Sequence, residues 1–400
     1  MRKSVKYLNI SKAVSILIFI SLYILFLPLN ISNLQASADE STENLQLEEM
    51  INGQLDNLDL EELEKYVESL GDFSNKPIRD RIVEYIKGGV VDYKSFFGAL
   101  GEVFFEQVVE LLPAFVCITA VALLSGIIIT LKSSSSGQTS SEMIFIITYA
   151  AALIPLFGVL IGVFRTSLQA ISSMRKQMQL IYPLMLTLMA ASGGSVSASV
   201  CRPAVAFFST TIVSIIDSCV LPFTIAIMVF SMASKLTKDL KIGKFTAFFK
   251  SINKWIIGIC VSVFGIFFTL QGITGVTYDG IVRRAAKYAI GNGVPIVGGF
   301  LSGGFDLAVA GGILIKNSLG TMGIFLMLSV LFEPIALLVA VNVLLRMVSA
   351  ITQPFGDGRL SDFLGETAEN LHYCTASVLF VAFLYFLSIM VMIFSTEALL

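Results

Sequence analysis

Residues that could form a catalytic or metal site are few in this sequence, and their spacing matches no known motif for such a site. The five cysteines form no C-x-x-C pair, and the single histidine, His372, cannot supply an H-E-x-x-H zinc motif. The stretch 312–318 resembles a phosphate-binding loop only superficially, because its glycines and its lysine are misplaced. We therefore expect no enzyme, no cofactor and no metal site. Any energy source must be another protein or a gradient.

An intramembrane protease is the enzyme class that needs separate consideration. An aspartyl version requires two membrane aspartates, and Asp279 with Asp306 is the only tempting pair. Three basic residues follow Asp279 closely, which places it at the membrane surface. A serine version requires a basic partner such as histidine inside the bilayer, and the sequence offers none there. Both versions are therefore disfavoured.

Charged residues inside apolar stretches are the remaining chemical candidates, because a buried charge in a membrane is costly and usually functional. They are Arg202, Asp217, Asp306, Lys316 and Glu333. Arg202 could pair with Asp217, and Asp306 with Lys316, to give one charge pair in each half of the chain. The alternative is that each residue lies near a membrane interface or at a bend. Among them, Asp306 is the strongest functional candidate, since glycines and apolar residues surround it.

The elements that must position these residues are membrane helices. Hydrophobic residues make up 55% of the 400 residues and charged residues only 14%, against roughly 25% charge in soluble domains. The mean hydropathy is +0.82. The net charge is −2 and no basic groove for nucleic acid is visible. Seven segments have the length of a membrane span, about 20 apolar residues: 108–131, 142–164, 181–201, 203–234, 255–275, 293–345 and 373–395.

The N-terminal region predicts export followed by a small helical domain. A basic start, an apolar run and an A-x-A site at 36–38 are typical of a signal peptide over 1–38, although an uncleaved anchor is the alternative. Residues 39–107 then form an acidic, helical extracytoplasmic domain. Its acidic surface is either a docking surface for a partner or a solvated helix pair.

Proline and glycine predict interruptions in two of the longer segments. Asp217 and Pro222 interrupt 203–234, and Pro334 interrupts 293–345. Non-helical backbone at membrane depth persists only where protein or water surrounds it. We therefore expect broken or re-entrant elements, with hinges or breaks at Pro183, Pro222, Pro295 and Pro334.

The lysines predict which side of the membrane each connection occupies. Six lysines against one aspartate make 235–254 the most basic loop, which marks the cytoplasmic side. From an external N-terminal domain, 108–131 crosses inward and 142–164 returns, and an odd number of crossings between 181 and 234 reaches this loop. The segment 255–275 then crosses outward, an odd number of crossings between 293 and 345 leads back in, and the last helix ends outside. Arg165, Arg175 and Lys176 fall outside in this topology. They violate the rule mildly and could belong to an interfacial amphipathic helix.

An internal repeat relates two parts of the membrane region. A first membrane helix and loop at 108–141 precede repeat 1 at 142–254 and repeat 2 at 255–372, and the last helix is 373–400. Ser192-Gly193-Gly194 recurs as Ser302-Gly303-Gly304. Paired Gly- and Pro-interrupted segments mark the substrate path in many transporters, so we expect both triplets and Asp306 near such a path. The alternative is that these small residues only pack helices closely.

Four stretches resemble the stage III sporulation protein AE family of endospore-forming bacteria. They are MASKL at 232–236 through KW at 254–255, GITG at 272–275, DG at 279–280 with RRAAKY at 283–288, and PIVGGFLS at 295–302. The order of signal, acidic domain and multi-spanning region also matches, so the resemblance covers essentially the whole chain.

The resemblance implies a subunit of the channel apparatus between mother cell and forespore, in the mother-cell-derived outer forespore membrane. It also implies partners: other membrane subunits, a separate cytoplasmic ATPase and a forespore-side protein. The apparatus supports late forespore gene expression, and the family carries no known catalytic residues. Our expectation is a membrane subunit that lines or gates a transport path. The alternative is a non-conducting scaffold that assembles the other subunits.

Overall fold

The computed structural model describes residues 50–56, 58–69, 77–86, 93–133, 138–236, 242–293, 298–354 and 358–397. The regular elements in these residues are all helical, which confirms the predicted all-α class. The predicted signal peptide at 1–38 and the predicted hinge at Pro295 lie outside the described residues.

Two short helices precede a set of long, rod-like ones. A helical segment at 50–56 is followed by α3 (Glu61–Glu68) and α4 (Ile78–Ile86). The long helices are α5 (Tyr93–Ser133), α6 (Gln138–Ala191), α10 (Gly243–Gly293), α11 (Gly298–Thr352) and α12 (Gly358–Glu397). One further rod is composite and runs without a gap through α7 (Ser195–Ala206), the π-helix η2 (Phe207–Ile212), α8 (Val213–Ile215), the π-helix η3 (Ile216–Val220) and α9 (Leu221–Leu236).

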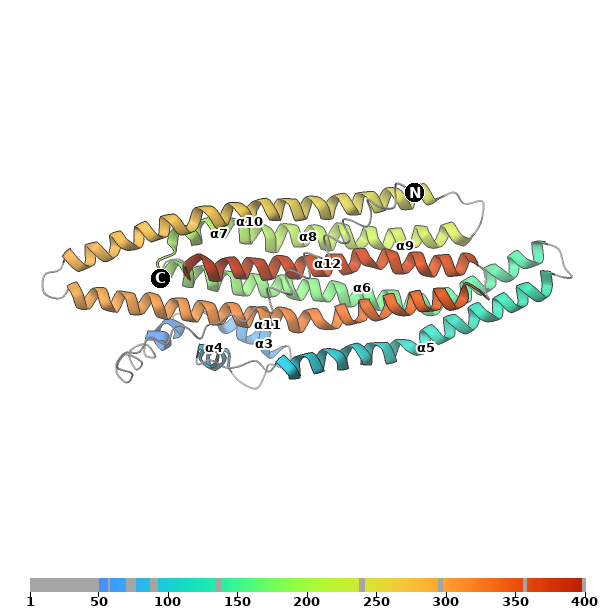
Figure 1. Cartoon of the computed structure of the whole chain (residues 1–400), viewed down its shortest axis with the longest axis horizontal. Coiled ribbons are helices and arrows are strands. Elements are labelled where there is room, and N and C mark those ends of the chain that lie inside the picture. The colour runs from blue at the N-terminus through green and yellow to red at the C-terminus, as the bar shows by residue number, and fades with distance from the viewer. Residues whose placement is uncertain are drawn as a thin grey trace.

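The rods lie side by side along the longest axis of the molecule (Figure 1). The 54 residues of α6 span about 80 Å at 1.5 Å per residue, whereas the hydrocarbon core of a bilayer is about 30 Å thick. In the part of the chain that the structure describes, six helices are long and apolar enough to cross a membrane. The chain is therefore a multi-pass membrane protein whose bundle is longer than a bilayer is thick.

The predicted division between 142–164 and 181–201 is wrong, since α6 runs without interruption through the first segment and on to Ala191. The chain turns only at 192–194, inside the second predicted segment. The polar stretch between the two segments does not end the helix, because Arg165, Ser172 and Lys176 fall on its exposed side. The buried Ser167 and Gln177 have hydrogen-bond partners. Ile171, Met174 and Met178 continue the buried stripe at helical spacing. Arg165, Arg175 and Lys176 accordingly belong to α6 and not to a separate interfacial helix.

The predicted breaks at Pro183 and Pro334 are also absent, since these residues lie inside α6 and α11. A proline inside a helix costs about 3 kcal/mol, but ending a helix at membrane depth would leave several backbone groups without partners. Pro222 is the second residue of α9, directly after η3. There the helix changes type without ending.

The two Ser-Gly-Gly triplets are not equivalent in the structure. Gly193 and Gly194 form the turn between α6 and α7, and Gly193 adopts φ +87°, a left-handed conformation that favours glycine. Ser302, Gly303 and Gly304 lie within α11, after its start at Gly298. The repeat in sequence therefore does not place the triplets at matching points of the fold.

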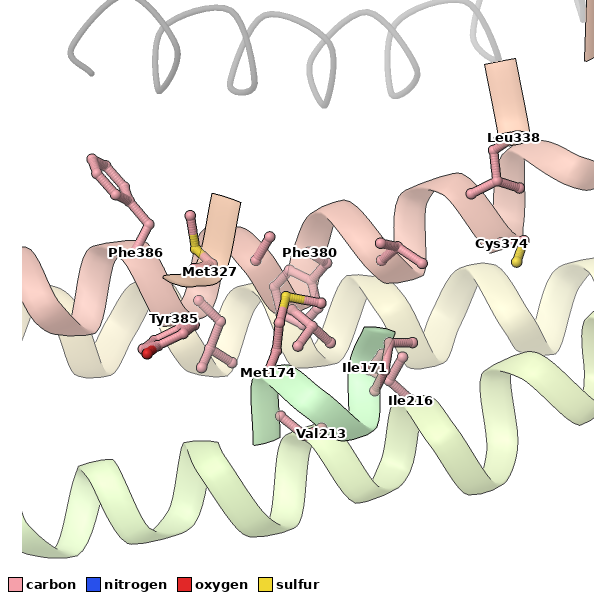
Figure 2. Packing of buried hydrophobic residues seen from close by; sticks show 14 of the residues in the cluster. Ile171, Met174, Val213, Ile216, Met327, Leu338, Cys374, Phe380, Tyr385 and Phe386 are labelled. Carbon is pink, nitrogen blue, oxygen red and sulfur yellow. The ribbon is translucent and has the colours of Figure 1, made fainter. Parts of the chain in front are cut away.

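The core surrounds α12 and is closed by large side chains. Figure 2 shows Met174 of α6, Met327 of α11, and Phe380 and Tyr385 of α12 meeting in its centre. The rings of Tyr182 and Tyr385 lie edge to face, 5.7 Å apart, and both are fully buried. On the α11 side, a Cβ added to Gly320 would come within 2.8 Å of Ile393. The interior of a single chain is thus packed and holds no open passage at these positions.

The short N-terminal helices pack along α11 and α6 (Figure 1). Leu63 of α3 and Ile82 of α4 are buried. The Gln177 amide of α6 donates a hydrogen bond of 3.1 Å to the Tyr66 hydroxyl, and burial raises the pKa of this phenol. The region predicted as the extracytoplasmic domain is therefore attached to the bundle, and α5 already begins inside its range, at Tyr93.

Candidate functional site

The surface of α6 divides the bundle into two halves. From 145 to 168 its exposed side chains are apolar apart from Arg165, and the large ones include Ile147, Ile154 and Ile161. From 171 to 191 they are polar or small: Ser172, Lys176, Gln179, Pro183, Thr187, Ala190 and Ala191. We call these stretches the lipid-facing half and the polar half of α6. A water-exposed surface so rich in large apolar residues would be unusual, so the first half has the character of a lipid-facing surface.

Other helices extend the apolar surface, and together with the lipid-facing half of α6 they form what we call the apolar belt. Its members are Leu112, Val116, Leu124 and Ile127 of α5, Ile225 and Val229 of α9, Trp255, Ile259 and Val263 of α10, and Val339, Val343, Met347 and Ile351 of α11. All of them are exposed. The belt is the part of the bundle that suits the hydrocarbon core of a membrane.

Ser192, predicted to lie near a transport path, is packed between helices. Ser192 is 0% exposed and its hydroxyl donates to the Leu188 carbonyl at 2.7 Å. The Ser192 side chain fills the space beside Gly312 of α11, where a Cβ would collide with it. The side chains of Ser302 and Asp306, and the surroundings of Gly303 and Gly304, are outside the described residues. The geometry at the first triplet is that of a helix turn packed against α11.

The charges predicted at membrane depth have different partners from those expected. Asp217 pairs with Arg175 of α6 at 3.0 Å, and not with Arg202, which is exposed on α7. Glu333 is exposed on α11. The error arose because α6 and η3 are brought together by the turn at Gly193, a long-range contact that spacing along one segment does not reveal.

Among the predicted charges whose side chains the structure describes, Lys316 alone is deeply buried. Its side chain is 0% exposed, and its ammonium donates to the carbonyl of Ile393 at 2.8 Å. Ile393 lies about one turn before the end of α12 at Glu397, where the helix dipole gives the carbonyl groups partial negative charge. Lys316 thus ties α11 to the end of α12, which is a structural role.

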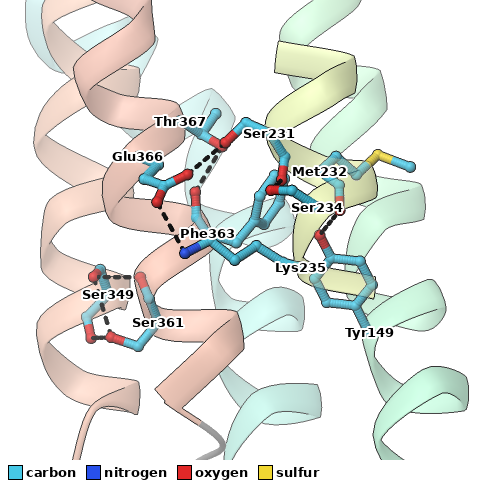
Figure 3. A network of polar contacts seen from close by, with 10 residues as sticks. All are labelled: Tyr149, Ser231, Met232, Ser234, Lys235, Ser349, Ser361, Phe363, Glu366 and Thr367. Atoms are coloured by element: carbon cyan, nitrogen blue, oxygen red, sulfur yellow. Dashed lines mark hydrogen bonds and ion pairs between the residues drawn. The ribbon is translucent and has the colours of Figure 1, made fainter. Parts of the chain in front are cut away.

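A polar network that the sequence analysis did not identify joins α9 and α12 (Figure 3). The Glu366 carboxylate accepts a hydrogen bond of 2.6 Å from Ser231 and forms an ion pair of 2.9 Å with Lys235. Nearby, the Tyr149 hydroxyl donates to the Met232 carbonyl at 3.0 Å. The carboxylate therefore lies between helices, held by one cation and one hydroxyl.

The exposed side of α12 continues this network as a polar surface. Between Arg359 and Ile393 the exposed side chains of α12 are Asp362, Glu369 and His372. With Glu366 they make up what we call the α12 polar face. Arg346 of α11 lies 3.2 Å from the His372 ring and also bonds Asn342 at 2.9 Å. No large apolar side chain interrupts this face.

The α12 polar face lies at the level of the apolar belt. Asn342 of α11 donates to the Ala368 carbonyl at 2.7 Å, and Ser349 donates to the Ser361 carbonyl at 2.8 Å. These bonds place 342–349 of α11, which carries the belt residues Val343 and Met347, beside 361–368 of α12. Charged side chains at lipid depth are costly and face water or another chain. The α12 polar face is therefore the candidate functional site.

Sequence reasoning missed this site because it left 346–372 between two predicted membrane segments, 293–345 and 373–395. The signal was present: Leu360, Phe363, Leu364, Thr367 and Leu371 recur at helical spacing, with the acidic residues on the opposite side. A helix that begins at Gly358 carries both its polar start and its apolar remainder. His372 was noticed, but its neighbour Arg346 comes from another helix.

Comparisons with known proteins give a family for this chain. A family model described as "Stage III sporulation protein AE" matches residues 79–396. A protein of Bacillus subtilis (strain 168) named "Stage III sporulation protein AE" is 25% identical over 263 residues, which cover 66% of this chain and 66% of the relative. The match thus spans just under two thirds of that relative's length. No solved structure matches the chain.

Proposed function

This chain belongs to the stage III sporulation protein AE family, and on that premise we propose that it is a multi-pass membrane subunit of the channel apparatus between mother cell and forespore. In this role it is not an enzyme. It lines or gates a path through which the mother cell supports late forespore gene expression. The observation that carries the path is the α12 polar face, a row of charged side chains at the level of the apolar belt.

The path runs along the outside of the bundle, between this chain and neighbouring subunits. The closed core around Tyr182, Phe380 and Tyr385 argues against a passage through one chain. The exposed charges of Asp362, Glu369 and His372 argue against a lipid neighbour at that face. A second chain placed opposite the face would enclose a water-filled route.

The proposed orientation places the polar face at the cytoplasmic end. Lys235 and the other lysines of 235–254 lie on the cytoplasmic side by the distribution of positive charge. Six crossings from an external α3–α4 region then put the α6–α7 turn and the end of α12 outside. In the sporulating cell this membrane is the mother-cell-derived outer forespore membrane. The partners are the other membrane subunits, a separate cytoplasmic ATPase and a forespore-side protein.

The second candidate function is a scaffold that assembles the other subunits and conducts nothing. Its support is the packed core together with α3, whose first turn carries Glu61, Glu62 and Glu64 on the outer surface of the bundle. An acidic helix fixed in place by buried Leu63 and Val67 suits the docking of a basic partner. This reading makes the acidic helix, and not the α12 polar face, the important surface.

Sporulating cells that carry single variants distinguish the two functions. For a path we expect Glu369→Leu and His372→Leu each to lower a late forespore reporter at least tenfold, with unchanged amounts of protein in the membrane. Glu62→Leu, an exposed acidic control on α3, should leave the reporter within twofold. The opposite pattern, loss with Glu62→Leu and normal activity with both α12 variants, would establish the scaffold instead.

A further inference from the structure

An apolar groove opens between α6 and α9 within the apolar belt. Its volume is about 410 Å³. Leu156, Leu160 and Phe164 of α6 form one wall, Met228 and Met232 of α9 form the other, and Phe363 of α12 lies at the floor. The groove is separate from the α12 polar face, and what is inferred about it does not depend on the proposed function.

The rim of the groove is open to the surroundings of the belt. Phe157 and Ile161 of α6 and Val229 of α9 line it and are 38%, 59% and 46% exposed. In a membrane such a groove borders on lipid tails and not on water. Close-packed proteins seldom leave an apolar volume of this size empty, so a hydrocarbon chain is the natural occupant.

The polar residues that line the groove are Arg165, Gln169 and Thr367. Arg165 and Gln169 line it one and two helical turns beyond Ile161. Arg165 is exposed and, among the described residues, has no ion-pair partner. The lining of α6 from Leu153 to Gln169 is about 24 Å long, enough for an acyl chain that reaches across one leaflet, roughly 15 Å deep. The Arg165 guanidinium therefore lies where the headgroup of a lipid bound by its acyl chain would emerge from the groove.

We propose that this groove is a phospholipid site, in which one acyl chain lies between α6 and α9 and Arg165 binds the phosphate. A guanidinium matches phosphate oxygens with two parallel hydrogen bonds, and the Gln169 amide supplies a further donor. A net negative charge of the headgroup, as in phosphatidylglycerol, is not required by the geometry. The lipid also gives a role to Arg165, a positive charge that the distribution of basic loops leaves on the outer side.

Native mass spectrometry of the purified full-length chain tests this site. The probes are phosphatidylglycerol and phosphatidylcholine added to the detergent-solubilised protein, with soluble glycerol phosphate as a third ligand. We expect both lipids to remain bound to the wild-type chain and glycerol phosphate not to bind. Arg165→Ala should lower lipid retention at least tenfold, and Arg202→Ala, an exposed arginine of α7, should leave it unchanged.

A second pair of variants tests the groove itself without disturbing the core. Ile161→Trp places an indole at the exposed rim and should displace the acyl chain, whereas Ile154→Trp lies outside the groove, is 75% exposed as isoleucine and should retain lipid. Retention that is indifferent to both Arg165→Ala and Ile161→Trp would overturn the proposal. Equal binding of glycerol phosphate would overturn it too, since phosphate alone would then suffice. Loss of a co-purifying protein with Ile161→Trp, at unchanged lipid retention, would assign the groove to a partner helix.

Discussion

The two halves of α6 differ on their exposed side and agree on their buried side. In the lipid-facing half the exposed residues include Ile147 and Ile154, and in the polar half they include Gln179 and Thr187. The buried stripe continues through both, from Leu156 to Met185. One helix therefore serves two surroundings. The interior of the bundle is uniform along its length, and only the side chains facing outward record where the membrane ends.

This difference explains why hydropathy overstates the membrane-embedded length. The apolar helix 145–191 is 47 residues long, or about 70 Å, more than twice the hydrocarbon thickness. Its second half has a high mean hydropathy because its buried side packs against α11 and α12, although its exposed side is polar. A helix buried by protein and a helix buried by lipid can have the same mean hydropathy, but the side chains on their exposed faces differ.

The largest expected effect comes from placing the same charge on each half. Ile154→Lys should destabilise the protein in lipid nanodiscs by about 3 kcal/mol, the cost of a lysine at bilayer depth. Thr187→Lys should change stability by less than about 0.5 kcal/mol, as is usual for an exposed position. Thermal unfolding of both variants in nanodiscs measures the difference. Equal effects would mean that the two halves share one environment.

A second contrast concerns glycines in the polar half and in the belt. Gly320 of α11 faces Ile393 and Met185 so closely that a Cβ would meet both, whereas no neighbouring atom lies within 4 Å of a Cβ at Gly258 of α10. Gly320→Leu should cost about 2 kcal/mol through overpacking. Gly258→Leu should be close to neutral in lipid. If thermal unfolding showed Gly320→Leu to be neutral, α11 would be loosely packed where it lies beside the polar half of α6.

Ion pairs in the two parts should also differ in strength. Lys235 and Glu366 lie beside the belt, and the Glu366 carboxylate also accepts a hydrogen bond from Ser231. A double-mutant cycle of Lys235→Met and Glu366→Gln should give a coupling free energy of about 1 kcal/mol. A coupling near zero would mean that this network is fully hydrated and not held between helices.

The smallest effect is expected for the pair between α6 and η3. Arg175 and Asp217 are 25% and 30% exposed, about as much as Lys235 and Glu366 at 23% and 36%. Arg175 belongs to the polar half of α6, however, so water and salt screen this pair more strongly. A cycle of Arg175→Gln and Asp217→Asn should give about 0.5 kcal/mol. Measuring it at low and high salt sharpens the comparison, since the coupling should vanish at high salt. A pair that is stronger than Lys235–Glu366 would reverse the assignment of the two environments.

The sequence allowed the helical class, the multi-pass membrane architecture and the family to be predicted. The predicted division of α6 failed because Lys176 and Gln179 resemble a surface segment when the buried stripe beside them is ignored. The prediction of a break at Pro334 failed because a proline can remain inside a helix that neighbouring helices stabilise. The partners of Asp217 and Glu366 could not be predicted, since each comes from a helix distant in sequence. The α12 polar face required knowing which side of that helix the others leave uncovered.

The most direct test of the α12 polar face is cysteine labelling in the bilayer. The five native cysteines are replaced, and single cysteines are introduced as Glu369→Cys and His372→Cys, with Val343→Cys as the lipid-facing control on α11. We predict that a hydrophilic thiol reagent labels the two α12 positions as fast as an exposed Glu62→Cys, while Val343→Cys stays near background. Reactivity at 369 and 372 no greater than at 343 would contradict a water-facing surface at this depth.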